Sequence, residues 1–172
     1  MGQAADPGSP VRGLAVAPAE AADFAEVAAL VADATREAFA SPGLTGEQIA
    51  ENRKWISVAR ETCLAAIADP ARSAFVAKLD GRLAGFVLAD RLDPDVPEIG
   101  WLMVAPRHHG IGVAQALMDA ALGWIGPGLP VKLTVIAANA RAIAFYRKYG
   151  FADAGPAPRD YAIARRLLVR PG

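Results

Sequence analysis

The spacing of apolar residues along the chain follows two periods, one typical of strands and the other of helices. Alternating or short continuous apolar runs predict strands over residues 11–16, 74–79, 82–89, 98–104, 131–136, 151–154 and 161–168. Helical spacing predicts helices over residues 21–39, 45–68 and 114–125, and a further helix after Asn139. Strands dominate the first half and alternate with helices in the second, an order that predicts one mixed α/β sheet with helices packed on it.

Local signals mark several of the predicted boundaries. Thr45 and Gln48 have the spacing of a capping box that opens the second helix. The pair Asp80-Gly81 separates two alternating runs and predicts a β-hairpin with a primed turn. The run 131–136 is apolar enough that we expect its strand to be buried on both faces.

Length and composition limit what the protein can be. The 172 residues predict one domain, which we place at residues 11–172 behind a mobile, disordered tail at 1–10. Eighteen basic and eighteen acidic side chains give no basic field, so nucleic acid is not an expected partner. No apolar run suits a membrane span or a signal peptide, and the lone Cys63 forms no internal disulfide. We therefore expect a cytoplasmic protein that does not bind a membrane.

The stretch from Glu98 to Ala114 combines a strand, a glycine turn and the start of a helix. Pro106 ends the strand because proline has no N–H for a neighbouring strand, and Gly110 and Gly112 permit a tight turn. Such a helix start leaves N–H groups free for a phosphate. The Lys-Ser/Thr pair of a P-loop and the third glycine of a dinucleotide fingerprint are both missing. By itself, the stretch is equally an ordinary βα turn.

A second motif decides between these interpretations. The first stretch fits V-x-P-x-x-[QR]-x-x-G-x-[GA] through Val104, Pro106, His109, Gly112 and Ala114. The second fits N-x-x-A-x-x-F-Y-x-x-x-G-F, and its specified places are filled by Asn139, Ala142, Phe145, Tyr146, Gly150 and Phe151. Together they resemble the signatures of the GCN5-related N-acetyltransferase (GNAT) family. His109 departs from the Gln or Arg that the family prefers, a change that we expect to tune affinity.

The resemblance implies a mixed, mostly antiparallel seven-stranded sheet, flanked by about four helices and splayed between strands 98–104 and 131–136. It also implies acetyl-CoA as co-substrate. The pantetheine arm would lie in the splay and the pyrophosphate on the backbone N–H groups from His109 to Ala114, with Arg107 or His108 adding positive charge. The implied cofactor-binding residues are Leu102, Met103, Val104, His109, Gly110, Ile111, Gly112, Val113, Ala114, Asn139 and Tyr146.

The resemblance further implies direct attack of an amine on the acetyl thioester, without an acyl-enzyme. Tyr146 takes the place of the family's general acid, and Glu98 matches the base of its histone-modifying branch. Two alternatives to Glu98 stay open: it is a solvated strand-end carboxylate, or the base is a water chain or another carboxylate, such as Glu47 or Glu51. The acceptor wall would include Phe39, Asn52, Trp55 and Ile56, although Trp55 and Ile56 equally suit simple packing.

The predicted function is thus acetyl transfer from acetyl-CoA to a primary amine of a small molecule or a peptide. One alternative is a non-catalytic acyl-CoA-binding or regulatory module with the same fold, and another is a purely structural domain. The two histidines, His108 and His109, have no carboxylate or cysteine at metal-site spacing, so no metal is expected. The acceptor, the acyl-chain preference and the choice between monomer and homodimer are left open by the sequence.

Overall fold

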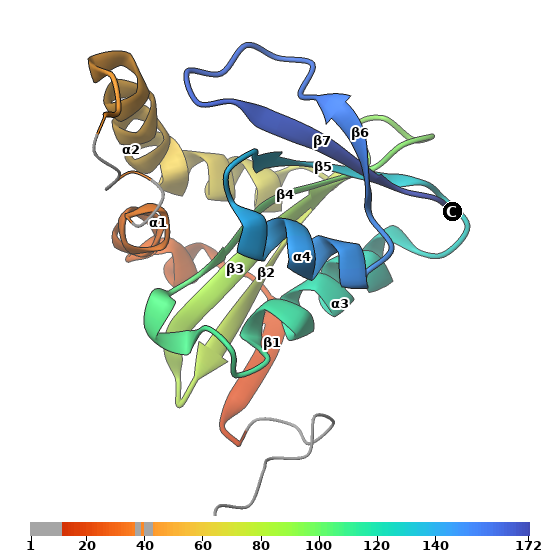
Figure 1. Cartoon of the computed structure of the whole chain (residues 1–172). Coiled ribbons are helices and arrows are strands. Elements are labelled where there is room, and N and C mark those ends of the chain that lie inside the picture. The colour runs from red at the N-terminus through yellow and green to blue at the C-terminus, as the bar shows by residue number, and fades with distance from the viewer. Residues whose placement is uncertain (1–11, 37–38, 40–42) are drawn as a thin grey trace, which may run out of the picture.

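The structure is a computed structural model that describes residues 12–36, 39 and 43–172. Within these residues seven strands form one sheet in the order β1-β2-β3-β4-β5-β7-β6 (Figure 1). The strands are β1 (Leu14–Pro18), β2 (Arg72–Leu79), β3 (Arg82–Asp90), β4 (Glu98–Val104), β5 (Val131–Ile136), β6 (Ala152–Pro156) and β7 (Arg165–Arg170). All neighbouring strands are antiparallel except β4 and β5. The mixed, mostly antiparallel seven-stranded sheet is confirmed.

Helices cover both faces of the sheet. They are α1 (Val27–Thr35), α2 (Gly46–Ala68), α3 (Val113–Ile125) and α4 (Ala140–Lys148), with short 3-10 helices η1 (Ala21–Phe24) and η2 (Pro106–His108). Apolar side chains of α1 and α2 form one buried cluster with the sheet, and those of α3 and α4 form the other. Figure 1 shows the two helix pairs on opposite sides. Among the described helices, none has the length and apolar character needed to traverse a bilayer.

Both predicted boundary signals are confirmed. Thr45 Oγ1 accepts the Gln48 N–H at 3.2 Å, and Gln48 Oε1 accepts the Thr45 N–H at 3.0 Å, so the capping box begins α2. Asp80 and Gly81 have φ of 49° and 80°, as a primed hairpin turn requires. Asn139 Oδ1 accepts the Ala142 N–H at 3.0 Å and caps α4.

Several expected boundaries were wrong. Residues 21–39 do not form one helix, because Asp23 accepts the Glu20 N–H and pairs with Lys78 of β2, which fixes η1 as a separate turn before α1. The first strand spans Leu14–Pro18 rather than 11–16, and the last two lie a few residues later than predicted. The expected disordered tail at 1–10 lies outside the described residues, as do 37 and 38 of the predicted helix.

The strand β5 is buried on one face only, contrary to prediction. Val131, Leu133 and Val135 are buried, whereas Lys132 and Thr134 are only half-buried. The reason is that β4 and β5 pair at a single position, Glu98 with Lys132, and then separate. The expected splay therefore leaves the second face of β5 open to a cleft.

A β-bulge redirects β4 beside this gap. Phe86 pairs with Met103 and Leu88 with Gly100, so Trp101 and Leu102 together face one residue of β3. Trp101 has φ of 49°, a left-handed conformation that is uncommon for a bulky residue. Such a deviation within a strand re-aims side chains and backbone, and here it does so at the cleft.

Candidate active site

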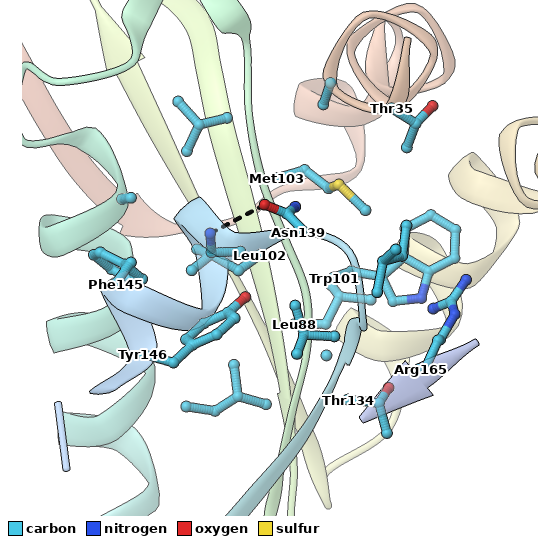
Figure 2. A pocket seen from close by; sticks show the side chains of 18 of the residues that line it. Thr35, Leu88, Trp101, Leu102, Met103, Thr134, Asn139, Phe145, Tyr146 and Arg165 are labelled. Carbon is cyan, nitrogen blue, oxygen red and sulfur yellow. Dashed lines mark hydrogen bonds between the residues drawn. The ribbon is translucent and has the colours of Figure 1, made fainter. Parts of the chain in front are cut away.

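The cleft begins where β4 and β5 separate and has a volume of about 1140 Å³. Its walls come from α1, α2, β4, β5, α4 and the connection between β6 and β7. Figure 2 shows Phe145 and Tyr146 on one side of it, Arg165 and Thr134 on the other, and the β4 residues Trp101 and Leu102 between them. The volume exceeds that of most single-ligand pockets, so the cleft has room for a cofactor and a second substrate.

The edge of β4 forms the floor of this cleft. Leu102, Met103 and Val104 all line it. Leu102 has no pairing partner on β3 or β5, because it lies in the bulge and beyond the single β4–β5 pair. Its backbone is therefore open to an extended ligand that adds hydrogen bonds to a strand edge.

The glycine turn follows the end of β4. Gly110 and Gly112 have φ of 79° and 90°, and Gly112 is the N-cap residue of α3 without a capping side chain. The first helical bond runs from the Ala116 N–H to the Gly112 carbonyl, so the N–H groups of residues 113–115 find no backbone acceptor in the described chain. The His109 N–H, in contrast, is donated to the Pro106 carbonyl at 3.1 Å. The amides open to an anion thus start after His109.

The predicted cofactor residues of this turn are not all on the cleft surface. His109, Gly110 and Ala114 line it. Val113 is buried in the core on the α3 side, and Ile111 is exposed. The Val113 side chain therefore holds the turn and the Ile111 side chain faces outward. Only the backbone of these two residues is placed near the cleft.

Arginines supply positive charge near the turn, and His108 does not. His109 Nε2 lies 3.1 Å from the Val104 carbonyl oxygen and 3.3 Å from Arg141 Nη2, and it can satisfy only one of them, since it is either a donor or an acceptor. Arg107 Nε donates to His108 Nε2 at 3.1 Å. Burial and the Arg107 charge lower the pKa of His108, so this ring is neutral at neutral pH.

Tyr146 lies on the buried side of α4. Its ring packs edge-on against Phe145 and Phe151, and burial raises the pKa of its hydroxyl to about 12. Figure 2 shows the hydroxyl directed into the cleft, toward Leu102. The Tyr146 side chain is therefore part of the core, while the residue also lines the cleft.

Glu98 lines the cleft at the point where β4 and β5 meet. Burial and the cross-strand neighbour Asp90 raise the pKa of its carboxyl, and Lys132 and Arg159 act in the opposite direction. Lys132 also lies 3.6 Å from Asp93. Glu98 is therefore a half-buried carboxylate at the cleft and not a fully solvated one.

Comparisons with known proteins agree with this geometry. The family model described as "Acetyltransferase (GNAT) family" matches residues 29–151. The chain belongs to the GNAT acetyltransferase family. It is 34% identical to an uncharacterized N-acetyltransferase of Mycobacterium tuberculosis over 112 residues, which are 59% of this chain and 72% of the relative.

Two solved acetyltransferase structures are similar to this one. The PaiA N-acetyltransferase of Thermoplasma acidophilum, in complex with coenzyme A, superposes with a TM-score of 0.74 at 17% identity, over 92% of this chain and 99% of that one. A nourseothricin acetyltransferase has a TM-score of 0.55 at 33% identity, over 60% of this chain and 66% of that one. The first likeness shows the fold, and the second adds sequence similarity over part of it.

On the far side of this GNAT cleft, the structure separates the predicted acceptor residues. Phe39, Asn52 and Trp55 line the cleft, whereas Ile56 packs in the α2 core and has the simple packing role. Of the alternative bases, Glu47 is exposed in the first turn of α2 and does not line the cleft. Glu51 does not line it either.

Several cleft residues were missed by sequence reasoning. Among them, Trp101, Tyr161 and Arg165 line the cleft from the bulge and from the β6–β7 region. No motif marks them, because their positions follow from the β4 bulge and from the pairing of β7 with β5. The last strand was predicted at residues 161–168, and it begins four residues later, at Arg165. Within the described residues, no three His, Cys, Asp or Glu side chains gather as metal ligands would.

Proposed function

We propose that the protein is an acetyl-CoA-dependent N-acetyltransferase that transfers an acetyl group directly to a primary amine of a small molecule or a peptide. The observation that carries the proposal is the cleft at the β4–β5 separation, which joins the open α3 amides to Tyr146 and Glu98. The names of the relatives, which are N-acetyltransferases and an antibiotic acetyltransferase, support an amine acceptor.

Acetyl-CoA would bind along the surfaces on the α4 side of the cleft. Its pantetheine arm would extend along Leu102, Met103 and Val104, where β4 no longer pairs with β5. Its pyrophosphate would accept hydrogen bonds from the amides between Gly110 and the first turn of α3, at the positive end of the helix dipole. Arg107 and Arg141 supply the nearby positive charge that an anionic cofactor requires.

The transfer needs three groups from the chain. The amine nitrogen attacks the thioester carbonyl carbon, a C–N bond forms, and the C–S bond breaks. A backbone N–H near Val104 would stabilise the oxyanion, an interaction typically worth about 3 kcal/mol in acyl transfer. Tyr146 gives its proton to the leaving thiolate, and it holds that proton through the neutral range because burial raises its pKa to about 12.

The remaining proton leaves the substrate ammonium. Glu98 accepts it, directly or through water, before the nitrogen attacks. A carboxyl whose pKa is raised is a stronger base than an ordinary one. Glu51 is less suited, because its Oε2 already accepts the Ala162 N–H at 2.6 Å.

Two measurements test the proposal. The first is the thermal midpoint with acetyl-CoA, with adenosine as control, because acetyl-CoA at 100 times its dissociation constant adds about 2.7 kcal/mol to folding stability. The second is release of free CoA thiol across an amine library. An acetyl-CoA-induced shift without thiol release from any amine would favour the non-catalytic acyl-CoA-binding module. No shift at millimolar acetyl-CoA would favour a structural domain.

A further inference from the structure

Arg165 is a largely buried cation on the acceptor side of the cleft. It is the first residue of β7 and pairs with Ile136 at the end of β5, so its side chain lies on the α2 face of the sheet. The exposed fraction of the side chain is 20%, and its guanidinium stacks on the Tyr161 ring at 4.3 Å from the ring centroid. Figure 2 shows it beside Thr134, across the cleft from Tyr146.

Part of the hydrogen-bonding capacity of this guanidinium is unused within the described residues. Arg165 Nε is buried and has no acceptor among the described residues. The nearest carboxylate oxygen is Glu51 Oε1, 3.7 Å from Nη2, which balances the charge but is too far for a hydrogen bond. Glu51 Oε1 is itself without a hydrogen-bond partner. A buried guanidinium normally uses most of its five donors, so these donors are suited to an incoming group.

A second unused donor faces the same region. Trp55 lies one helical turn after Glu51 and therefore on the same face of α2. Its indole Nε1 is buried without an acceptor among the described residues, although the ring lines the cleft and packs edge-on against Trp101. Two buried donors from different elements thus belong to residues that line the same cleft, and each costs stability while it stays unpaired.

We propose that the acceptor amine also carries a carboxylate, and that Arg165 binds this carboxylate with help from the Trp55 indole N–H. This inference rests on the proposed function, because it names the acceptor class for the same site. The cleft carries both charges that such a molecule needs. Glu98 and Asp90 line it where β3 and β4 pair and suit the ammonium group, while Arg165 lines it at the start of β7 and suits the anion.

A structural role for Arg165 is the competing explanation. Gln48 Nε2 donates to the Ala162 carbonyl at 3.0 Å and Glu51 accepts the Ala162 N–H, so α2 holds the β6–β7 connection by its backbone. Arg165 could serve only to neutralise Glu51 in this clamp. That role explains the 3.7 Å ion pair, but it explains neither the unpaired Nε nor the unpaired Trp55 indole.

The experiment compares free amino acids with their carboxamides. Amino acids with the amine in the α, β or terminal position are assayed with acetyl-CoA, each beside the amide that lacks the negative charge. The measured quantity is the ratio of kcat/KM for acid over amide. For the best acid we expect a ratio of about 10 to 100, since one charge-assisted hydrogen-bonded pair is at stake.

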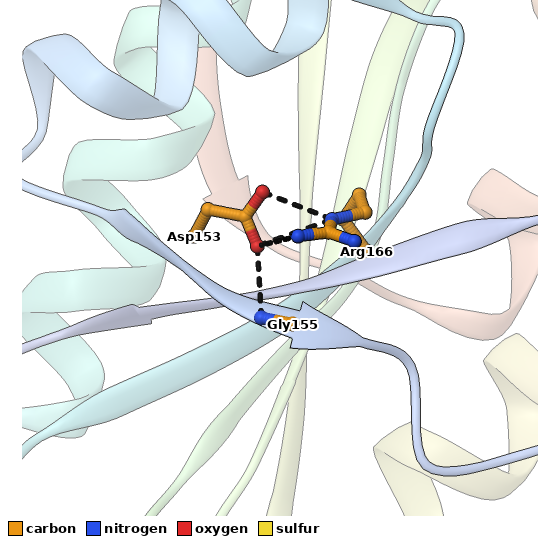
Figure 3. Close-up of polar contacts among 3 residues, drawn as sticks. All are labelled: Asp153, Gly155 and Arg166. Carbon is orange, nitrogen blue, oxygen red and sulfur yellow. Dashed lines mark hydrogen bonds and ion pairs between the residues drawn. The ribbon is translucent and has the colours of Figure 1, made fainter.

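The variants isolate the two donors. Arg165→Met should bring the ratio close to 1 by lowering kcat/KM for acids, with amides little affected. Trp55→Phe should lower the ratio several-fold. It removes the indole N–H but keeps an aromatic ring and the Glu51–Arg165 pair. It therefore tests the carboxylate site even if Arg165→Met fails to fold. The matched control is Arg166→Met on the same strand, because Arg166 binds Asp153 at 2.8 Å and does not line the cleft (Figure 3).

Each result is decisive. A wild-type ratio near 1 in every pair, while some amines are acetylated, would overturn the carboxylate site and leave the proposed function standing. An equal loss for acids and amides in Arg165→Met and no effect in Trp55→Phe would assign Arg165 to the structural clamp. If no amine of any kind is acetylated, the proposed function fails and the acceptor class fails with it.

Discussion

Asp90 and Glu98 stand directly opposite each other in the antiparallel pair of β3 and β4, so two carboxylates share one position of the sheet. Like charges at such a cross-strand position repel. Together with burial, Asp90 raises the pKa of Glu98, while Lys132 on the other side of β4 partly offsets the effect. This environment destabilises the ionised form of Glu98. Proton uptake by this carboxylate is therefore more favourable, as the role of a general base requires.

The cross-strand pair of Asp90 and Glu98 predicts the acid limb of the pH profile of activity. A base works only when it is deprotonated, so activity should rise with pH as Glu98 loses its proton, at a pH above that of an ordinary glutamate. Asp90→Asn removes the repelling charge and keeps an oxygen that can accept the Leu92 N–H. The pKa of Glu98 should then fall, and the acid limb of kcat/KM should move to lower pH.

Asp95→Asn is the control for this shift. Asp95 carries the same charge in the exposed loop before β4 and does not line the cleft. Its substitution should leave the limb in place. An unchanged limb in Asp90→Asn, or a limb that persists in Glu98→Gln, would mean that another group accepts the proton.

Tyr146→Phe tests the general acid. Losing a proton donor typically costs about 100-fold or more in rate, and the loss should fall on kcat with little change in the KM for acetyl-CoA. In the wild type, Tyr146 should impose no alkaline limb below pH 10, because its pKa is raised to about 12. Steady-state kinetics across pH 6 to about 10 measure both effects, since the tyrosine reference pKa is about 10.

Tyr149→Phe is a matched control on the same helix. Tyr149 also has a pKa raised to about 12, but its hydroxyl donates to the Gln115 carbonyl at 3.3 Å on the α3 side and does not line the cleft. This variant should retain its kcat. Equal turnover in Tyr146→Phe and Tyr149→Phe would remove the acid role from Tyr146.

The sequence was sufficient for most of the fold because local chemistry matched it. The capping box at Thr45, the Asp80-Gly81 turn and the Asn139 cap each satisfy backbone groups within a few residues, so they could be recognised without knowing the partners. The order of strands and helices then limited the topology. Family signatures supplied the remaining step, because residues of both motifs line the same cleft.

The features that escaped prediction depend on partners distant in the chain. The left-handed Trp101 arises from two β4 residues facing one residue of β3, which no local pattern encodes. The half-open face of β5 exists because β4 pairs with it only once. Arg165 reaches the cleft because β7 inserts between β5 and β6. Its ion-pair partner, Glu51, is separated from it by most of the chain.

Acetyl-CoA binding should depend on the glycine turn. Gly110 has φ of 79° and open space around its absent side chain, so Gly110→Asp adds a negative charge at little steric cost, in a conformation that Asp tolerates. The charge should repel the pyrophosphate. In the wild type, acetyl-CoA at 100 times its dissociation constant should raise the thermal midpoint by roughly 5–10 °C for a domain of this size.

The variant Gly128→Asp separates repulsion from backbone strain. Gly128 has φ of 83° with nothing near its absent Cβ, and it lies in the loop before β5, outside the cleft. Both variants should lose similar stability without ligand. Only Gly110→Asp should lose the shift caused by acetyl-CoA, and a full shift in it would place the pyrophosphate elsewhere.

The last prediction concerns how closely β3 supports the cleft floor. A Cβ added at Gly85 would lie 2.6 Å from the Met103 carbonyl oxygen, a backbone atom that can yield only if β4 moves. Gly85→Ala should therefore reduce the free energy of unfolding by about 1–3 kcal/mol, as other overpacked positions do. Because Met103 belongs to the segment expected to hold the pantetheine arm, the same variant should also weaken acetyl-CoA binding.

Gly123→Ala makes the opposite change in stability. Gly123 is exposed within α3, its added Cβ would meet nothing within 4 Å, and alanine favours a helix by about 0.8–1 kcal/mol over glycine. Denaturant unfolding of both variants should show opposite signs, with acetyl-CoA affinity unchanged in Gly123→Ala. If Gly85→Ala is as stable as the wild type and binds acetyl-CoA equally well, then β4 can shift freely, and its bulge does not fix the position of the thioester.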